Sequence, residues 1–108
     1  MTIQFKPEQH IHIIGIGGSG MSAIARLLLL RGVQVSGSDQ RCNTITEALV
    51  DIGAIIFEGH AAQHVNKADW VIASSAVPDD HIEIVTAQAQ NIPVYRRMDI
   101  MGALMAGY

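Results

Sequence analysis

A glycine-rich segment, HIIGIGGSGMS at residues 12–22, most constrains what this chain can fold into. Gly15, Gly17 and Gly20 fit the pattern G-x-G-x-x-G between an apolar run and a leucine-rich stretch. The first glycine permits a tight turn, the second lets a pyrophosphate approach the backbone, and the third lets helix and strand pack closely. Free N–H groups and the dipole at the start of the following helix favour an anion. The segment therefore predicts a phosphate-binding loop between a strand and a helix.

Strand and helix patterns alternate along the rest of the chain. The predicted strands are 10–16, 33–39, 54–57, 69–74 and 92–96, and predicted helices follow the glycine loop and span 44–53, 79–91 and 97–106. Residues 58–68 are predicted to form a loop or a short helix. Because right-handed crossovers join parallel neighbours, we expect an α/β fold, a Rossmann-like open doubly wound parallel sheet of about five strands in three α/β/α layers.

Helical spacing also predicts which residues face the sheet. They are Met21, Ile24, Ala25 and Leu28 in the first helix, Ile45, Ala48, Leu49 and Ile52 in the second, and Ile82, Val85 and Ala89 in the third. Gly32 and Gly53 are expected to end the first two helices, and Thr44 and Glu47 have the spacing of a capping box. Core positions are further predicted for Trp70 and for three methionines of the last helix, Met98, Met101 and Met105.

Composition excludes several classes of protein. A chain of 108 residues, 49% of them hydrophobic, is enough for one domain and too short for two. The net charge is −3 and the cations are scattered, so no nucleic-acid or membrane partner is expected. The chain lacks a long apolar run and a signal peptide, and its single Cys42 has no thiol partner, which favours a soluble protein in a reducing, intracellular compartment.

Asp39 stands at the end of the second predicted strand, where a carboxylate accepts hydrogen bonds from ribose hydroxyls. The glycine loop and Asp39 together specify a diphosphate and a ribose, and they leave the choice of nucleotide open. One alternative is an NAD(P)-binding domain of a dehydrogenase or a sensing module, in which Arg41 would favour NADP. A purely structural interaction domain is a third possibility.

Other polar residues have simpler expected roles. His10 and His12 alternate along a strand, but no third ligand accompanies them, so we expect core or exposed histidines and no metal site. His64 and His81 are expected at the surface. The adjacent acids Asp79 and Asp80 are expected to cap a helix and not to act as a catalytic pair. Ser74 and Ser75 lack the G-x-S-x-G elbow of hydrolases, and we expect them to be ligand donors.

Four segments in order, IIGIGGSGMSAIARLLLLRGVQVSGSD, GAIIFEGH, ADWVIASSAVPDD and IPVYRRMDIMGALM, resemble the N-terminal domain of the Mur ligase family of peptidoglycan synthesis. GIGGSGMS is similar to the branch that adds L-alanine to UDP-N-acetylmuramate, since the branch that attaches murein peptides usually has a cysteine and bulkier residues in this loop. The resemblance implies a substrate site for UDP-N-acetylmuramate. Its residues would be Gly17, Gly18, Ser19, Gly20 and Met21 at the diphosphate, Ser38 and Asp39 at the ribose, and His60, Ser74, Ser75, Ala76, Arg96 and Arg97 along the crevice.

The resemblance also implies a reaction. ATP and Mg²⁺ convert the lactyl carboxylate of UDP-N-acetylmuramate into an acyl phosphate, which the amino group of L-alanine attacks in the cytoplasm. That chemistry needs a G-x-x-G-K-[ST] loop, which this sequence lacks. We therefore expect residues 1–108 to form a single UDP-N-acetylmuramate-binding domain that binds no cofactor and holds no catalytic residue. The ATP, Mg²⁺ and L-alanine sites would lie in ATPase and C-terminal domains outside this chain.

Overall fold

A parallel sheet forms the centre of the computed structural model, which describes residues 8–97, 99 and 100. Its strands are β1 (His10–Ile14), β2 (Gln34–Asp39), β3 (Ile55–Glu58), β4 (Trp70–Ala73) and β5 (Val94–Arg96), in the order β3-β2-β1-β4-β5. The connections contain α1 (Ser19–Leu30), α2 (Thr44–Asp51), the short 3-10 helix η1 (Ala62–Val65) and α3 (Ile82–Ala89). The predicted doubly wound α/β fold is confirmed.

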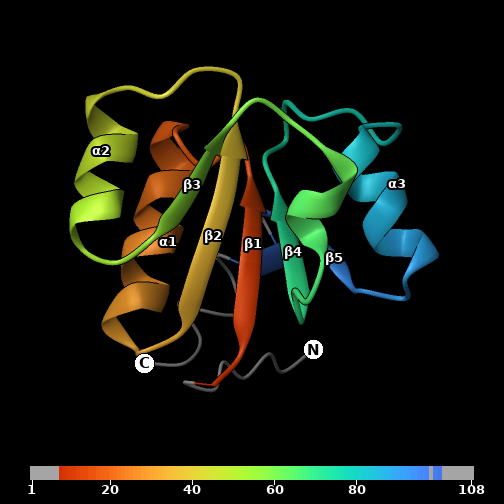
Figure 1. The fold of residues 1–108 in the computed structure, drawn as a ribbon, viewed down its shortest axis with the longest axis horizontal. Coiled ribbons are helices and arrows are strands. Elements are labelled where there is room, and N and C mark those ends of the chain that lie inside the picture. The colour runs from red at the N-terminus through yellow and green to blue at the C-terminus, as the bar shows by residue number, and fades with distance from the viewer. Residues whose placement is uncertain (1–7, 98, 101–108) are drawn as a thin grey trace.

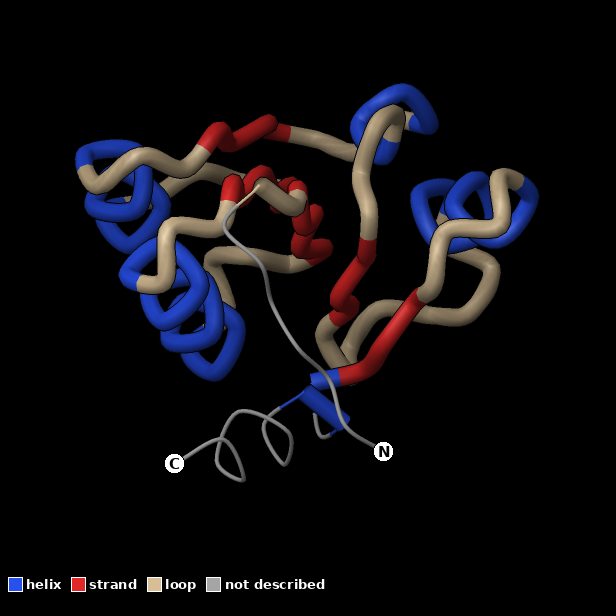
Figure 2. Tube along the Cα trace, turned by 90° about the horizontal axis from the view of Figure 1, so that it is seen from below, coloured by secondary structure: helices blue, strands red, loops and turns tan. Residues whose placement is uncertain are grey.

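The helices cover the two faces of the sheet (Figures 1 and 2). On one side α1 and α2 pack over a core that includes Ile11 and Ile13 of β1. On the other side η1 and α3 cover a second core that includes Ile14, Val71 and Ile84. Strand residues are buried on both faces because crossover helices lie on each.

The strand order reverses beside β1. The chain moves from β1 to β2 and β3 in one direction, and β4 and β5 then lie on the other side of β1. Ile14 at the end of β1 is paired in register with Ser38 of β2 and Ala73 of β4, so the carboxyl ends of these strands meet at one edge. In an open α/β sheet this switch point is where a ligand crevice forms.

The prediction for α1 is confirmed. Met21, Ile24, Ala25 and Leu28 are all buried. Gly32 follows the last turn with a φ of +81°, a backbone conformation that favours glycine and ends the helix.

The predicted start of α2 at Thr44 and the inward position of Leu49 are confirmed, but the predicted capping box and the rest of the predicted inner face are not. The capping box is formed by Asn43 and Thr46, and not by Thr44 and Glu47. Thr46 and Leu49 are the buried residues, whereas Ile45 and Ile52 of the predicted stripe are exposed. Thr46 tolerates burial because its hydroxyl and backbone are satisfied by bonds with Asn43.

The predicted inner face of α3 is also wrong. Its buried residues are Glu83, Ile84 and Ala87, while the predicted inward residues, Ile82, Val85 and Ala89, are exposed. The start of α3 is capped by His81, whose Nδ1 accepts a hydrogen bond from the Glu83 N–H, and not by Asp79 or Asp80. The shift in phase follows from Glu83, since its carboxylate finds hydrogen-bond donors on the sheet side.

The remaining predictions have mixed outcomes. The segment 58–68 contains η1, as one of the two alternatives predicted. Trp70 is half-buried and packs on Tyr95, with ring centroids 5.1 Å apart. Arg97, Asp99 and Ile100 are helical, but Met98, Met101 and Met105 lie outside the described residues.

Among the residues described, no helix has the length and apolar character needed to span a bilayer.

Candidate functional site

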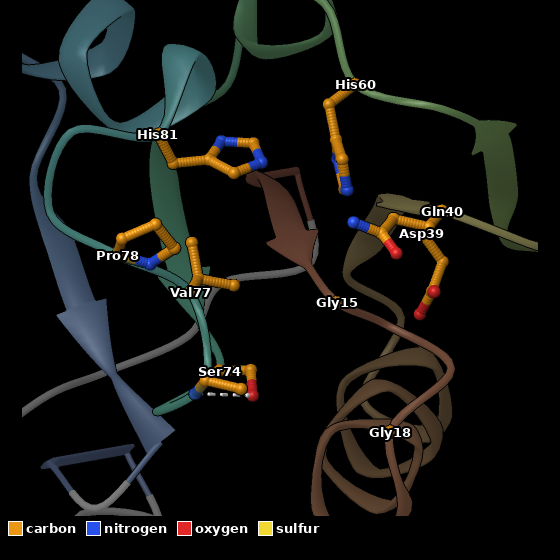
Figure 3. Close-up of a pocket in the computed structure, with 10 residues that line it drawn as sticks. Gly15, Gly18, Asp39, Gln40, His60, Ser74, Val77, Pro78 and His81 are labelled. Carbon is orange, nitrogen blue, oxygen red and sulfur yellow. Dashed lines mark hydrogen bonds between the residues drawn. The ribbon is translucent and has the colours of Figure 1, made fainter.

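A cavity of about 340 Å³ opens at the switch point between β1 and β4. The glycine loop and the ends of β2 and β4 form its walls, and His60 and His81 lie near each other at one side (Figure 3). The lining residues are Gly15, Gly18, Asp39, Gln40, His60, Ser74, Ala76, Val77, Pro78 and His81. Five of the predicted site residues are therefore in the wall, namely Gly18, Asp39, His60, Ser74 and Ala76.

The glycine loop turns sharply from β1 into α1. Gly15 has a φ of +79°, and its carbonyl oxygen accepts a hydrogen bond of 3.0 Å from the Gly18 N–H. Gly18 is the N-cap of α1, where no side chain caps the helix and no acidic residue occupies the first turn. This helix start therefore retains the partial positive charge that attracts an anion. Ser19 begins α1, and Met21 is buried in the core, so its side chain does not face the cavity.

Asp39 links the end of β2 to the glycine loop. Its Oδ2 accepts a hydrogen bond of 2.9 Å from the Gly17 N–H. A Cβ at position 17 would lie 2.9 Å from the same oxygen, so the Asp39 side chain would have to shift for any residue other than glycine. Asp39 thus fixes the loop and also lines the cavity.

The two predicted arginines have different positions. The Arg96 guanidinium donates to the carbonyl oxygens of Ser74 and Val77 and pairs with Asp79, so it holds the loop after β4. The Arg97 guanidinium lies over Gly20, where any Cβ would overlap it. Arg97 therefore adds a positive charge at the start of α1. Ser75 is exposed and is not in the cavity wall.

A buried carboxylate lies behind the cavity wall. Glu83 Oε1 accepts hydrogen bonds from His12 Nε2 at 2.6 Å and from the Ser38 hydroxyl at 2.8 Å. Its Oε2 accepts from the Ala61 N–H at 3.1 Å, from His64 Nδ1 at 3.1 Å and from His60 Nδ1 at 3.2 Å. Every one of these partners offers a hydrogen to a side chain that is fully buried.

This network shifts several pKa values. Burial acts to raise the pKa of Glu83, but hydrogen bonds from His12, Ser38 and His64 together with the charge interaction with His12 outweigh it and lower the pKa to about 2. Burial lowers the pKa of His12, and its contact with Glu83 only partly opposes that effect. Burial and the neighbouring His60 also lower the pKa of His81.

Several site residues were missed or misplaced by the sequence analysis. His64 is largely buried and bonded to Glu83, so its predicted surface position is wrong. His81 is half-buried and lines the cavity. The Ser38 side chain is fully buried and faces Glu83. Glu83 had no signal in the sequence, because a lone acid in a helical pattern is usually on the solvent face.

Within the described part of the chain, no group of three or more histidine, cysteine, aspartate or glutamate side chains is arranged to hold a metal ion.

Comparison with known proteins identifies the family. Residues 10–108 match the family model described as Mur ligase family, catalytic domain. The chain belongs to the Mur ligase family. A curated member from Thermobifida fusca, named UDP-N-acetylmuramate–L-alanine ligase, is 50% identical over 97 residues, which cover 90% of this chain and 21% of that protein. The chain thus spans about a fifth of the length of the curated Mur ligases that it matches.

Solved structures of Mur ligases share the fold. The UDP-N-acetylmuramate-alanine ligase of Thermotoga maritima has a TM-score of 0.87 and 35% identity, and the match covers 92% of this chain and 23% of that one. A murein peptide ligase of Psychrobacter arcticus has a TM-score of 0.75 and 29% identity, covering 81% of this chain and 18% of that one.

Proposed function

We propose that residues 1–108 form the N-terminal, Rossmann-like domain that binds UDP-N-acetylmuramate in an ATP-dependent ligase joining that substrate to L-alanine. The observation that carries the proposal is the crevice at the switch point, built from a bare glycine loop in a Mur ligase family chain. The names of the relatives from Thermobifida fusca and Thermotoga maritima support the choice of substrates.

The diphosphate is assigned to the start of α1. The backbone of Gly17, Gly18, Ser19, Gly20 and Met21 forms this region, where no side chain caps the helix. Arg97 over Gly20 supplies a guanidinium, which suits a phosphate because its donors form a rigid planar fork. Asp39 is assigned to the ribose, and Ser74 and Ala76, which line the cavity, to the opposite wall.

The chemical step is assigned to other parts of the ligase. ATP, together with Mg²⁺, would supply the phosphoryl group that activates the lactyl carboxylate. The glycine loop of this domain has no lysine with which to hold the phosphates of ATP. The described residues also lack a metal-binding group. In this domain the residues bind and orient the nucleotide sugar, in the cytoplasm, and L-alanine and ATP would meet it from domains beyond residues 1–108.

Thermal shift titration tests the assignment. UDP-N-acetylmuramate, and UDP more weakly, should raise the melting temperature of the 108-residue chain, whereas NAD and NADP should not. A ligand at a hundred times its Kd stabilises the folded state by about 2.7 kcal/mol, which is readily measured. Arg97→Ala should weaken the UDP effect, and Arg26→Ala, an exposed arginine of α1, is the matched control. A larger shift with NAD or NADP would contradict the proposal.

A further inference from the structure

Glu83 joins the sheet to the helices on one of its faces, behind the nucleotide crevice. The residue comes from α3, and its carboxylate contacts His12 of β1, Ser38 of β2 and the segment that precedes η1. Of the side chains bonded to this carboxylate, His60 is the one that also lines the cavity. A buried acid therefore has direct contact with a group that can meet the ligand.

The hydrogen-bond roles around Glu83 follow from its charge. With a pKa of about 2, the carboxylate is ionised at neutral pH and can only accept hydrogen bonds. The Ser38 hydroxyl uses its single hydrogen for Oε1 at 2.8 Å, so its oxygen acts as an acceptor toward His60. The charge of Glu83 thus decides which of its neighbours donate hydrogen bonds, whether or not a ligand is bound.

The two hydrogen-bond partners of His60 Nδ1 are both acceptors. Its Nδ1 lies 3.0 Å from the Ser38 oxygen and 3.2 Å from Glu83 Oε2. Both contacts are hydrogen bonds only when Nδ1 carries a hydrogen, and in a neutral ring Nε2 is then an acceptor. The ring extends from the loop after β3 into the cavity, toward Gln40 and Gly15 (Figure 3).

We propose that Glu83 is a positioning residue that holds His60 in the Nδ1–H form, so that Nε2 accepts a hydrogen bond from the bound nucleotide. The inference rests on the proposed function, because it takes the ligand to be a uridine nucleotide. Two groups of that ligand share the required chemistry, the imide N–H of uracil and the 2′-hydroxyl of the ribose. His60 would then discriminate among ligands by requiring a donor at this point.

Nitrogen-15 NMR of the histidine side chains tests the positioning role without a ligand. In the unmodified chain at about pH 8, where a histidine of ordinary pKa is neutral, His60 should carry its hydrogen on Nδ1. Glu83→Gln leaves one acceptor oxygen for five donors, so the Nε2–H form of His60 should become populated. Glu47→Gln makes the same change on an exposed position of α2 and should leave His60 unaltered.

Titration calorimetry tests the acceptor role. CDP lacks the imide N–H and 2′-deoxy-UDP lacks one ribose hydroxyl, so one of them should bind the unmodified chain roughly tenfold more weakly than UDP, the loss expected for one hydrogen bond. Which of the two binds weakly identifies the donor. His60→Ala should remove the discrimination, and Glu83→Gln should reduce it.

The possible failures are distinguishable. If His60 carries its hydrogen on Nε2 in the unmodified chain, the proposal is overturned even if UDP binds. This measurement does not depend on the folding of any variant. Equal discrimination by the unmodified chain and His60→Ala also overturns it. Absence of any UDP binding overturns the proposed function and the acceptor role with it, while the NMR result still decides whether Glu83 fixes the ring.

Discussion

Individual glycines of the glycine loop and of β2 have different roles in the structure. At Gly15 the backbone requires a positive φ of +79°, and a Cβ would lie 3.2 Å from the Cβ of Ser74. At Gly20 the neighbour is the flexible side chain of Arg97. The closest approach to backbone and core is at Gly37, where a Cβ would lie 2.7 Å from Ile16 Cβ and 2.9 Å from the Ile13 oxygen. The G-x-G-x-x-G pattern contains the first two of these positions and not the third.

Alanine substitutions separate these roles. Gly15→Ala should lower the free energy of unfolding by about 1–2 kcal/mol, the cost of left-handed backbone in a residue with a Cβ. Gly20→Ala should change that free energy by less than about 1 kcal/mol, since Arg97 can move aside, yet it should weaken UDP binding by displacing the guanidinium. Urea denaturation and calorimetry measure both effects. An equal loss of stability in the two variants would contradict the distinction.

Among the secondary structure elements, prediction from sequence succeeded where apolar residues dominate. The strands and α1 follow their apolar patterns because the sheet is buried on both faces and α1 packs against its centre. The helices α2 and α3 have eight residues each, so few positions face inward. In each of them a polar side chain, Thr46 or Glu83, takes an inward position because hydrogen bonds satisfy it. Apolar periodicity contains no information about such bonds.

The start of α2 provides a matched test. Asn43→Ala should lower the free energy of unfolding by about 1 kcal/mol, because the Asn43 side chain accepts from the N–H groups of Ile45 and Thr46. Thr44→Ala changes the neighbouring exposed residue and should have little effect. Thermal or urea denaturation of both variants measures the difference. A larger loss of unfolding free energy in Thr44→Ala than in Asn43→Ala would show that Thr44 caps the helix instead.

For the molecule as a whole, the sequence indicated where the site lies but not what supports it. Gly18, Asp39 and Ser74 fall at strand ends, and a parallel sheet brings such ends to one edge. The network around Glu83 depends on the placement of α3 from which this side chain reaches His12 of β1 and Ser38 of β2, and no local pattern specifies that placement. Its members are separated by up to 71 positions in the chain.

The same network makes folding stability depend on pH. The pKa of Glu83 is lowered from 4.5 to about 2, so its contribution is complete above pH 4.5 and is lost as the pH falls toward 2. The pKa of His12 is lowered from 6.5, so the unfolded chain takes up a proton first and stability already declines below pH 6.5.

Melting temperature as a function of pH tests this expectation. The melting temperature should fall steadily from pH 7 to pH 4 and more steeply below pH 4. In Glu83→Gln the melting temperature should depend less on pH below pH 4. Glu47→Gln, on the surface of α2, should retain the full pH dependence. A melting temperature that is constant between pH 7 and pH 4 would contradict the role assigned to His12, and one that is constant below pH 4 would contradict the role assigned to Glu83.

The end of β5 has a mechanical consequence for the crevice. Arg96 is bonded to the loop that forms one wall, at Ser74 and Val77. Its neighbour Arg97 lies over Gly20, at the opposite wall. Two successive residues thus connect one point of the chain to both sides of the opening. A displacement of this strand end would therefore disturb the loop after β4 and the start of α1 together.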